Sequence, residues 1–139
     1  MYLVCRGGKL DSQRGGRVAN PETILQNKIL ARHGARPNVR LWRNETAGAW
    51  VGKYLGRTPD GNVLIGSASH INAGLAVGSA DIIGIKDGRF VAIEVKMPGK
   101  NPTKQQKAFI DTVSAMGGIA GVARSIADSD RILGDPKGE

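Results

Sequence analysis

The sequence has few of the residues on which several common classes of small protein depend. Its 139 residues include one cysteine, Cys5, and two histidines. A single cysteine forms neither an internal disulfide nor a cysteine metal cluster, which indicates a reducing compartment. No apolar run approaches the roughly 18 residues of a membrane-spanning helix, and Arg6 and Lys9 make the start unlike a signal peptide. We therefore expect a cytoplasmic protein that makes no use of a membrane.

Acidic residues are also few in comparison with basic ones. Twenty Lys and Arg residues against twelve Asp and Glu residues give the chain a net charge of +8. A small domain this basic attracts polyanions, because cations that neutralise phosphates release condensed counterions. Solubility alone is the simpler reading of such charge, but nucleic acid is the partner that it favours. The charge does not separate a protein that cuts nucleic acid from one that only binds it.

Composition and local signals divide the chain into three parts. We expect a basic, Gly-rich N-terminal arm over 1–19, a single domain over 20–134 and a polar tail over 135–139. Asn20-Pro21 is typical of a helix start and Gly34 of a helix end. The expected elements are a helix over 20–33, strands over 39–45, 80–86 and 89–97, a helix over 101–116, a strand over 119–124 and a short helix over 127–133. This order predicts an α/β domain with a mixed β-sheet flanked by helices.

The segment over 46–78 gives weaker signals. It is rich in Gly, Ala and Ser, and Asp60-Gly61 marks the place of a short hairpin. We expect most of the segment to be a long loop, and loops of this length in small domains are usually functional or mobile.

Asp87-Gly88 lies between two β-branched runs and is a strong signal for a tight hairpin. A two-residue turn there places Asp81 directly opposite Glu94, with Cβ atoms about 4.5–5.5 Å apart. Two carboxylates so placed repel each other, and they repel more strongly when partly buried. A divalent cation with oxygen ligands between them would remove this repulsion. A β-bulge would shift the register by one residue and separate the pair.

Glu94 and Lys96 are two residues apart, so strand alternation places both on one face of the sheet. An ammonium group beside a metal could orient or deprotonate an attacking water, or neutralise charge as a phosphodiester becomes pentacovalent. Exposed Glu-x-Lys pairs are also common decoration of strands. The opposing Asp81 is what favours a metal-assisted hydrolytic site over decoration.

Two helical residues are expected to support this site. Glu22 shares the core-facing stripe of the first helix, where it either complements the helix macrodipole or reaches the metal, directly or through water. Gln106 lies on the apolar stripe of the second long helix, near the strand of Lys96. It either bonds a phosphate, a metal-bound water or Lys96, or makes a plain hydrogen bond to neighbouring backbone. Arg43, Asn44, Lys100 and Lys104 are the residues expected to contact nucleic acid.

Other candidate groups carry less information. His33 and His70 lack the spacing of metal ligands, and His33 fits the end of a helix. Trp42 and Trp50 could stack on bases, although packing in a core or an interface is the simpler expectation. The chain has no phosphate-binding loop and no serine or cysteine nucleophile arrangement.

The motifs together resemble a known family. Gly78-Ser79-Ala80-Asp81, followed after twelve residues by Glu94-Val95-Lys96, resembles the PD-(D/E)XK nuclease signature. Glu22, Arg43-Asn44 followed by Gly48, and Gln106-Lys107-Ala108-Phe109 narrow the resemblance to the VRR-NUC branch, over about residues 20–125. Ala80 departs from the proline that the wider superfamily often has before its aspartate. Stand-alone members of this branch are often encoded by viruses or prophages, which implies the cytoplasm of a bacterial host.

The resemblance implies a restriction-endonuclease-like core and DNA cleavage that depends on Mg²⁺ or Mn²⁺. It implies that Asp81 and Glu94 bind the metal together with the carbonyl of Val95, that Lys96 is the catalytic lysine, and that Glu22 and Gln106 support them. It also implies a homodimer that acts on branched DNA such as Holliday junctions. The main hypothesis is thus a Mg²⁺-dependent DNA endonuclease. The competing hypotheses are a non-catalytic DNA-binding protein with a structural acidic cluster and a nuclease that acts on RNA.

Overall fold

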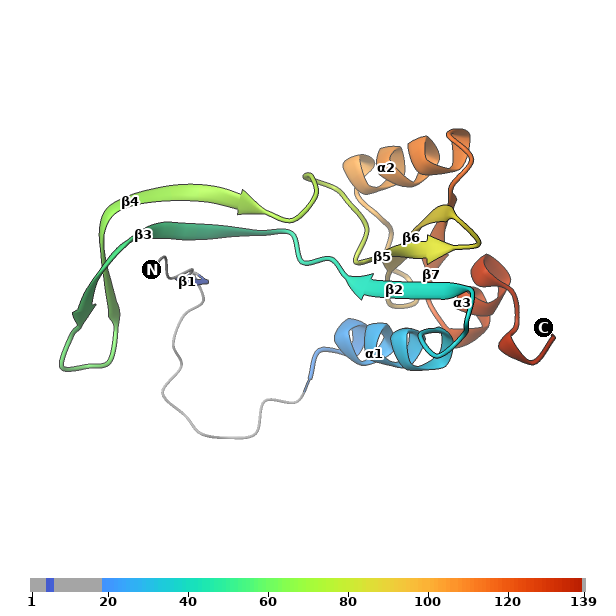
Figure 1. The fold of residues 1–139 in the computed structure, drawn as a ribbon, viewed down its shortest axis with the longest axis horizontal. Helices are drawn as coiled ribbons and strands as arrows, with labels where there is room; N and C mark the ends of the chain where they lie inside the picture. Colours follow the sequence, from blue (N-terminus) through green and yellow to red (C-terminus); the bar gives the residue numbers. More distant parts are fainter. Residues whose placement is uncertain (1–4, 7–18, 139) are drawn as a thin grey trace.

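The structure is a computed structural model that describes residues 5–6 and 19–138. Its elements are β1 (Cys5–Arg6), α1 (Pro21–His33), β2 (Val39–Arg43), β3 (Ala47–Arg57), β4 (Val63–Ala73), β5 (Ile82–Lys86), β6 (Arg89–Val95), α2 (Lys104–Ala115), β7 (Ile119–Ala123), α3 (Ile126–Leu133) and the 3₁₀ turn η1 (Pro136–Gly138). They form a mixed α/β structure, as the sequence predicts (Figure 1). Most of the expected N-terminal arm over 1–19 lies outside the described residues.

The larger of the two sheets has the strand order β2-β5-β6-β7. β2, β5 and β6 are antiparallel neighbours, whereas β6 and β7 are parallel, so the sheet is mixed as expected. The crossover from β6 to β7 runs through α2, which lies on one face of the sheet, while α1 and α3 lie on the other (Figure 1). No helix in the described part of the chain is long and apolar enough to cross a membrane.

The hairpin β5–β6, called the short hairpin below, has the predicted register. Ile82 pairs with Ile93, and Lys86 pairs with Arg89 across the turn. The φ angles of Asp87 and Gly88 are 49° and 75°, and positive φ at both central residues defines the type I′ turn that matches the twist of a hairpin. No bulge interrupts the pairing between these two strands.

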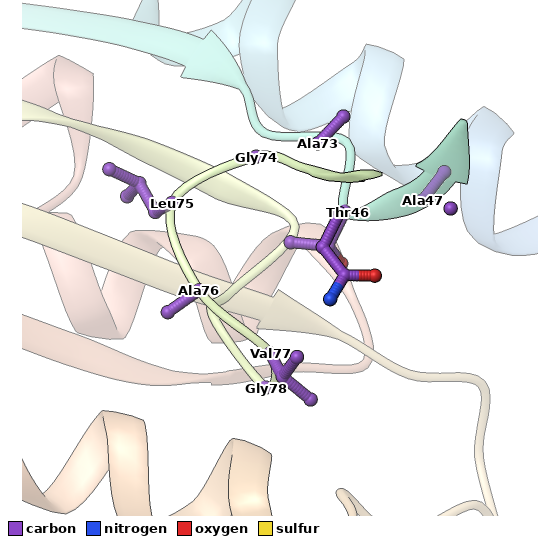
Figure 2. A pocket seen from close by; sticks show the side chains of 10 residues that line it. Thr46, Ala47, Ala73, Gly74, Leu75, Ala76, Val77 and Gly78 are labelled. Carbon is purple, nitrogen blue, oxygen red and sulfur yellow. The ribbon is translucent and has the colours of Figure 1, made fainter. Parts of the chain in front are cut away.

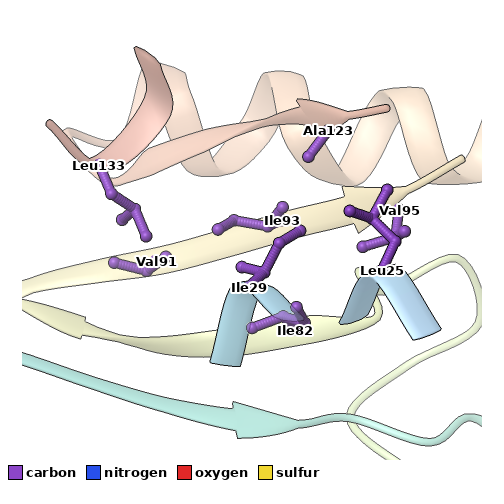
Figure 3. Packing of buried hydrophobic residues seen from close by; sticks show 8 residues of the cluster. All are labelled: Leu25, Ile29, Ile82, Val91, Ile93, Val95, Ala123 and Leu133. Carbon is purple, nitrogen blue, oxygen red and sulfur yellow. The ribbon is translucent and has the colours of Figure 1, made fainter. Parts of the chain in front are cut away.

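The core lies between this sheet and the helices α1 and α3. Leu25 and Ile29 of α1 meet sheet residues such as Ile82 and Ile93, and Leu133 of α3 closes one end (Figure 3). Ile29, Ile82 and Ile93 are fully buried, and burying each such side chain contributes about 1.5–3 kcal/mol. Odd-numbered residues of β6 therefore face the core, and even-numbered ones face the side of α2.

The helix boundaries follow from their capping residues. The Oδ1 atom of Asn20 accepts a hydrogen bond of 3.1 Å from the backbone N–H of Glu22, and α1 ends where the N–H of Gly34 donates to the carbonyl of Leu30. Thr103 caps α2, with its Oγ1 accepting from the backbone of Gln106 at 3.2 Å. Both helices begin within a few residues of the sequence-based expectation because these caps satisfy the first free N–H groups.

The segment over 46–78 is not the long loop that we expect from the sequence, although a hairpin turn lies at Asp60-Gly61 as predicted. β3 and β4 occupy most of this segment, and eleven residues in each strand form one antiparallel hairpin, called the long hairpin below. It extends away from the larger sheet and its helices, and β1 adds a third, very short strand along β3 (Figure 1). Two register shifts, between Val51 and Lys53 and between Tyr54 and Gly56, break its alternation. These bulges and the many small residues hide the strands from a period-two search of the sequence.

Candidate functional site

The short hairpin brings Asp81 and Glu94 together at one end of the larger sheet. The ladder register of β5 and β6, carried one residue beyond Ile82, places Asp81 across from Glu94. The Oδ2 atom of Asp81 accepts a hydrogen bond of 2.9 Å from the backbone N–H of Val95. This bond fixes the Asp81 carboxylate at the edge of β6, beside the side chain of Glu94.

Lys96 projects from the same face as Glu94, as strand alternation predicts. Its Nζ atom lies 2.7 Å from Oε1 of Glu94, and the two side chains are 15% and 0% exposed. The backbone of Lys96 is held in turn by β7, because its N–H donates to the carbonyl of Ala123 at 3.1 Å. The ammonium group therefore sits against a buried carboxylate and keeps a small opening to solvent.

The carboxylate of Glu94 is buried without a regular hydrogen bond. Among the described residues, neither Oε1 nor Oε2 accepts a hydrogen bond of normal geometry. The Nζ atom of Lys96 nevertheless lies within ion-pair distance of Oε1, so Oε2 is the oxygen without a close partner among the described residues. A buried carboxylate with so few partners is costly for a fold. Oε2 is thus available to a cation.

Burial alters the ionisation of all three side chains. It raises the pKa of Asp81, which the N–H of Val95 and the charge of Lys96 only partly offset. It also raises the pKa of Glu94, and the negative charge of Asp81 raises it further. Burial alone would lower the pKa of Lys96, but the contact with Glu94 and the charges of Asp81 and Glu22 outweigh it and raise that pKa. Two carboxylates and one ammonium group therefore leave this site with a net negative charge, which a bound cation would balance.

Glu22 lies within electrostatic reach of this group. It occupies the first turn of α1, where it is partly buried. Its charge raises the pKa of both Asp81 and Lys96. The described residues contain no cluster of three or more His, Cys, Asp or Glu side chains arranged to hold a metal ion. The structure thus brings together two carboxylates and a lysine, with Glu22 as a more distant charge.

Mg²⁺ fits a site of this composition. The ion usually keeps several waters and is bound through one or two carboxylates together with substrate phosphates. Asp81 and Glu94 supply two carboxylates, and the Glu94 oxygens lack hydrogen-bond partners among the described residues. The carbonyl of Val95, expected from the family resemblance to be a further ligand, follows directly on Glu94 in β6.

Gln106 takes the plainer of its two expected roles. Its Oε1 atom accepts a hydrogen bond of 2.8 Å from the backbone N–H of Thr103, which completes a capping box at the start of α2. The apolar stripe predicted for this helix is present, because Phe109, Ile110 and Val113 are partly buried together with Gln106. The oxygen of Gln106 therefore stabilises the helix end rather than contacting Lys96.

Asn44 braces the site instead of presenting its amide to solvent. Its Nδ2 atom donates to Oγ of Ser79 at 2.8 Å and to the carbonyl of Ala80 at 2.9 Å. Its backbone N–H also donates to the carbonyl of Asp81 at 2.8 Å. Asn44 thus ties the chain between β2 and β3 to the chain that enters β5. No local sequence pattern predicts this contact, since the partners are more than thirty residues apart.

The other residues expected to contact nucleic acid lie on the surface around the site. Arg43 donates to Oδ1 of Asn27 at 2.5 Å. Lys100 and Lys104 are exposed in the turn after β6 and at the first position of α2. The turn is held by the side chain of Arg124, which donates to the carbonyl of Lys100 at 2.8 Å. Both lysines therefore follow Lys96 closely along the chain.

A cavity of about 200 Å³ lies at the root of the long hairpin. Thr46, Ala47 and Gly48 of one leg face residues 72–78 of the other leg across it (Figure 2). Its wall ends three residues before Asp81, so the cavity adjoins the segment that Asn44 braces.

The tryptophans are not part of the core. Trp42 on β2 is 52% exposed, and Trp50 on β3 is 48% exposed. Trp50 makes an edge-to-face contact with His70. Packing in the core, one of the two simpler expectations for these residues, is therefore excluded.

A scan against protein-family models and a search of the curated proteins give no match to this chain.

Proposed function

We propose that the protein is a metal-dependent DNA endonuclease of the VRR-NUC branch of the PD-(D/E)XK nucleases, with a restriction-endonuclease-like core. The observation that carries the proposal is the grouping of Asp81, Glu94 and Lys96 at one end of the sheet, with Oε2 of Glu94 lacking a hydrogen-bond partner among the described residues. A carboxylate pair can hold the metal ion for phosphodiester hydrolysis, and a neighbouring lysine can stabilise the charge that develops on the phosphate.

Asp81 and Glu94 would hold Mg²⁺ or Mn²⁺, with the carbonyl of Val95 as a further ligand. The bound ion supplies Lewis acidity for the phosphodiester and lowers the pKa of a coordinated water. Asp81 is kept in place by the N–H of Val95. Lys96 holds its ammonium group against Glu94, where it orients the attacking water and balances the negative charge that develops on the phosphate.

The net charge of +8 supports DNA as the substrate, because a basic surface concentrates the phosphate backbone around the site. The resemblance favours branched DNA, including four-way junctions, in the cytoplasm of a bacterial host. One site per chain and two strands to cut favour a two-fold homodimer.

The competing class is a non-catalytic DNA-binding protein, and one observation favours it. The ion pair between Lys96 and Glu94 neutralises the buried carboxylate without any added cation. A protein of this class would bind DNA with the same affinity in the presence of metal or chelator and would leave the DNA intact.

The test is a cleavage panel on duplex, single-stranded, flapped and four-way DNA and on RNA, each with Mg²⁺, Mn²⁺ or chelator. Asp81→Asn keeps the acceptor for the Val95 N–H but loses the charge, so it should abolish metal-stimulated cleavage. Asp111→Asn, on an exposed side chain of α2, is the matched control and should cut at the wild-type rate. Intact substrates in every wild-type reaction would reject the nuclease, and cleavage confined to RNA would reject DNA as substrate.

A further inference from the structure

The long hairpin has one face on which aromatic side chains alternate with glycines, called the aromatic face below. Its members are Gly48, Trp50, Gly52 and Tyr54 of β3 with Ile65 and His70 of β4. A methyl group at Gly48 would lie 2.5 Å from Nε2 of His70, and one at Gly52 would lie 2.3 Å from Cγ2 of Ile65. His70 and Ile65 pair in register with Trp50 and Tyr54. The glycines thus leave the space that the β4 side chains fill, and all six positions share one side of the hairpin.

The rings of this face are held in place but remain open to solvent. Trp50 and His70 meet edge to face, with ring centroids 5.2 Å apart and ring planes at 74°. Trp50 nevertheless remains 48% exposed and Tyr54 remains 46% exposed. Tyr54 lies four positions after Trp50 along β3, which corresponds to about 13 Å of strand. Large aromatic side chains left exposed in a row are typical of a binding surface.

The long hairpin has little packing to stabilise it among the described residues. Two paired strands without a third strand or a covering helix are only marginally stable in water. Among the described residues, β1 is the further strand of this sheet, and it pairs with Ala49 and Trp50 alone. A ligand that covers the aromatic face would supply the missing burial.

The charges of the hairpin indicate the chemistry of that ligand. Residues 47–73 contain Lys53 and Arg57 but a single carboxylate, Asp60, which lies in the turn between the strands. Arg57 pairs with Val63, two residues from Ile65, so strand alternation places it on the aromatic face. Aromatic rings flanked by cations are the means by which proteins bind single-stranded nucleic acid. Paired bases in a duplex do not offer their faces to such rings.

The root of the hairpin connects this face to the candidate site. Gly48 belongs to the aromatic face and also lines the cavity of Figure 2. Asn44 at the base of β3 bonds Ser79 and the carbonyl of Asp81. The end of the aromatic face at Gly48 therefore adjoins the segment that leads to Asp81.

We propose that the aromatic face of the long hairpin binds unpaired nucleotides of a DNA strand, with bases stacked on Trp50 and Tyr54 and phosphates near Arg57. This inference rests on the proposed function, because it assigns part of the substrate of the same protein. It selects DNA with single-stranded segments over fully paired duplex.

The experiment measures equilibrium binding of the full chain to oligodeoxythymidylate and to a blunt duplex of equal length, both in chelator. Trp50→Ala should weaken binding to the single strand by about fivefold or more, since each stacked base contributes at least that factor. It should change duplex binding less than about twofold. Trp42→Ala is the matched control, because Trp42 is equally exposed but lies on the larger sheet. Trp50→Tyr keeps a stacking ring and should restore most of the affinity, which separates stacking from folding.

Fluorescence gives a second readout, because the chain has two tryptophans. In the Trp42→Phe variant, oligodeoxythymidylate should quench the remaining Trp50 emission. In the Trp50→Phe variant it should leave the Trp42 emission unchanged. Equal quenching in the two variants would overturn the proposal.

Three other outcomes would also overturn it. They are the absence of binding to oligodeoxythymidylate by the wild type, equal effects of Trp50→Ala and Trp42→Ala, and a loss of dimer with Trp50→Ala that alone accounts for the lost affinity. The last result would mean that a second copy of the chain covers the face. A stacking effect of Trp50 in a protein that cuts no DNA would reject the proposed function while leaving this inference in place.

Discussion

Glu94 and His33 are both fully buried polar residues, and their surroundings differ. His33 accepts a hydrogen bond at Nδ1 from Arg36 at 3.1 Å, and its Nε2 lies 3.1 Å from Oγ of Ser129. The Ser129 hydroxyl donates in turn to the carbonyl of Ile126 at 2.7 Å. The donors and acceptors in this series of hydrogen bonds indicate that His33 is a neutral imidazole with its proton on Nε2. Glu94, in contrast, accepts no regular hydrogen bond from the described residues.

The two sites use their buried polar groups in different ways. The network gives each ring nitrogen of His33 a partner and joins α1 to α3, so it serves the fold. The Glu94 carboxylate adds repulsion to Asp81 and keeps only the ion pair with Lys96. Natural folds tolerate such strain chiefly at functional sites. Substitutions in the His33 network should therefore lower stability, and substitutions of Glu94 or Lys96 should lower activity.

The largest expected effect is on cleavage. Lys96→Ala should lower the rate at saturating DNA and Mg²⁺ by about 100-fold or more, because one charge that stabilises the transition state is lost. Binding of DNA in chelator should change by less than about threefold. Lys107→Ala removes the same charge from an exposed pair with Asp111 on α2 and should cut normally. Unchanged cleavage by Lys96→Ala would mean that the group of Asp81, Glu94 and Lys96 serves only the fold, as the His33 network does.

The next effect is on folding. His33→Ala should lower the free energy of unfolding by about 1–3 kcal/mol or more, because it leaves buried partners unsatisfied and opens a cavity. His70→Ala changes the other histidine of the chain, which is exposed and makes a cross-strand contact with Trp50, and should cost less than about 1 kcal/mol. Chemical denaturation monitored by circular dichroism measures both. An equal loss of unfolding free energy in the two variants would mean that the buried network of His33 does not stabilise the fold.

Acid should act on the two regions in opposite directions. Burial lowers the pKa of His33 below its usual 6.5, and the nearby charge of Asp130 offsets this only in part. The unfolded chain then binds that proton more tightly, so stability present above about pH 6.5 is lost as the pH falls toward the lowered pKa. One such group changes stability by no more than about 1.4 kcal/mol per pH unit. Denaturation of wild type and His33→Ala at several pH values should show this slope in the wild type alone.

The carboxylates have the reverse sign. Burial raises the pKa of Glu94 above 4.5, so the folded protein binds that proton more tightly and gains stability as the pH falls through the raised pKa. The gain should vanish in Glu94→Gln. A wild-type pH profile identical to that of Glu94→Gln would contradict the reversed sign.

The smallest effect is the stability change of Glu94→Gln itself at neutral pH. The substitution keeps the shape, removes the repulsion between Glu94 and Asp81 and leaves Lys96 near the charge of Asp81, so the free energy of unfolding should stay within about 1 kcal/mol of wild type or rise. Cleavage should nevertheless be lost. A destabilisation as large as that of His33→Ala would assign Glu94 a structural role.

The sequence predicted the short hairpin and its register because the information is local. Asp87-Gly88 accepts positive φ at both turn positions, and alternation then fixes which side Glu94 and Lys96 occupy. The helix starts at Asn20 and Thr103 are likewise set by side chains within three residues of the backbone that they cap.

Features that depend on distant partners could not be predicted. The brace from Asn44 to Ser79 spans thirty-five residues, and no local pattern encodes it. The long hairpin was missed because its strands combine glycines with two register shifts, which removes the alternation that marks a strand. Gln106 had two open roles, and the geometry at Thr103 selects the cap.

Crystals of the full chain soaked in Mn²⁺ would locate the ion by its anomalous scattering. We expect one peak within coordination distance of the Asp81 and Glu94 carboxylates, next to Lys96, and no peak there in Glu94→Gln crystals. Wild-type crystals in which Mn²⁺ binds only elsewhere, with the Glu94–Lys96 ion pair unchanged, would show that this group of charges is not a metal site.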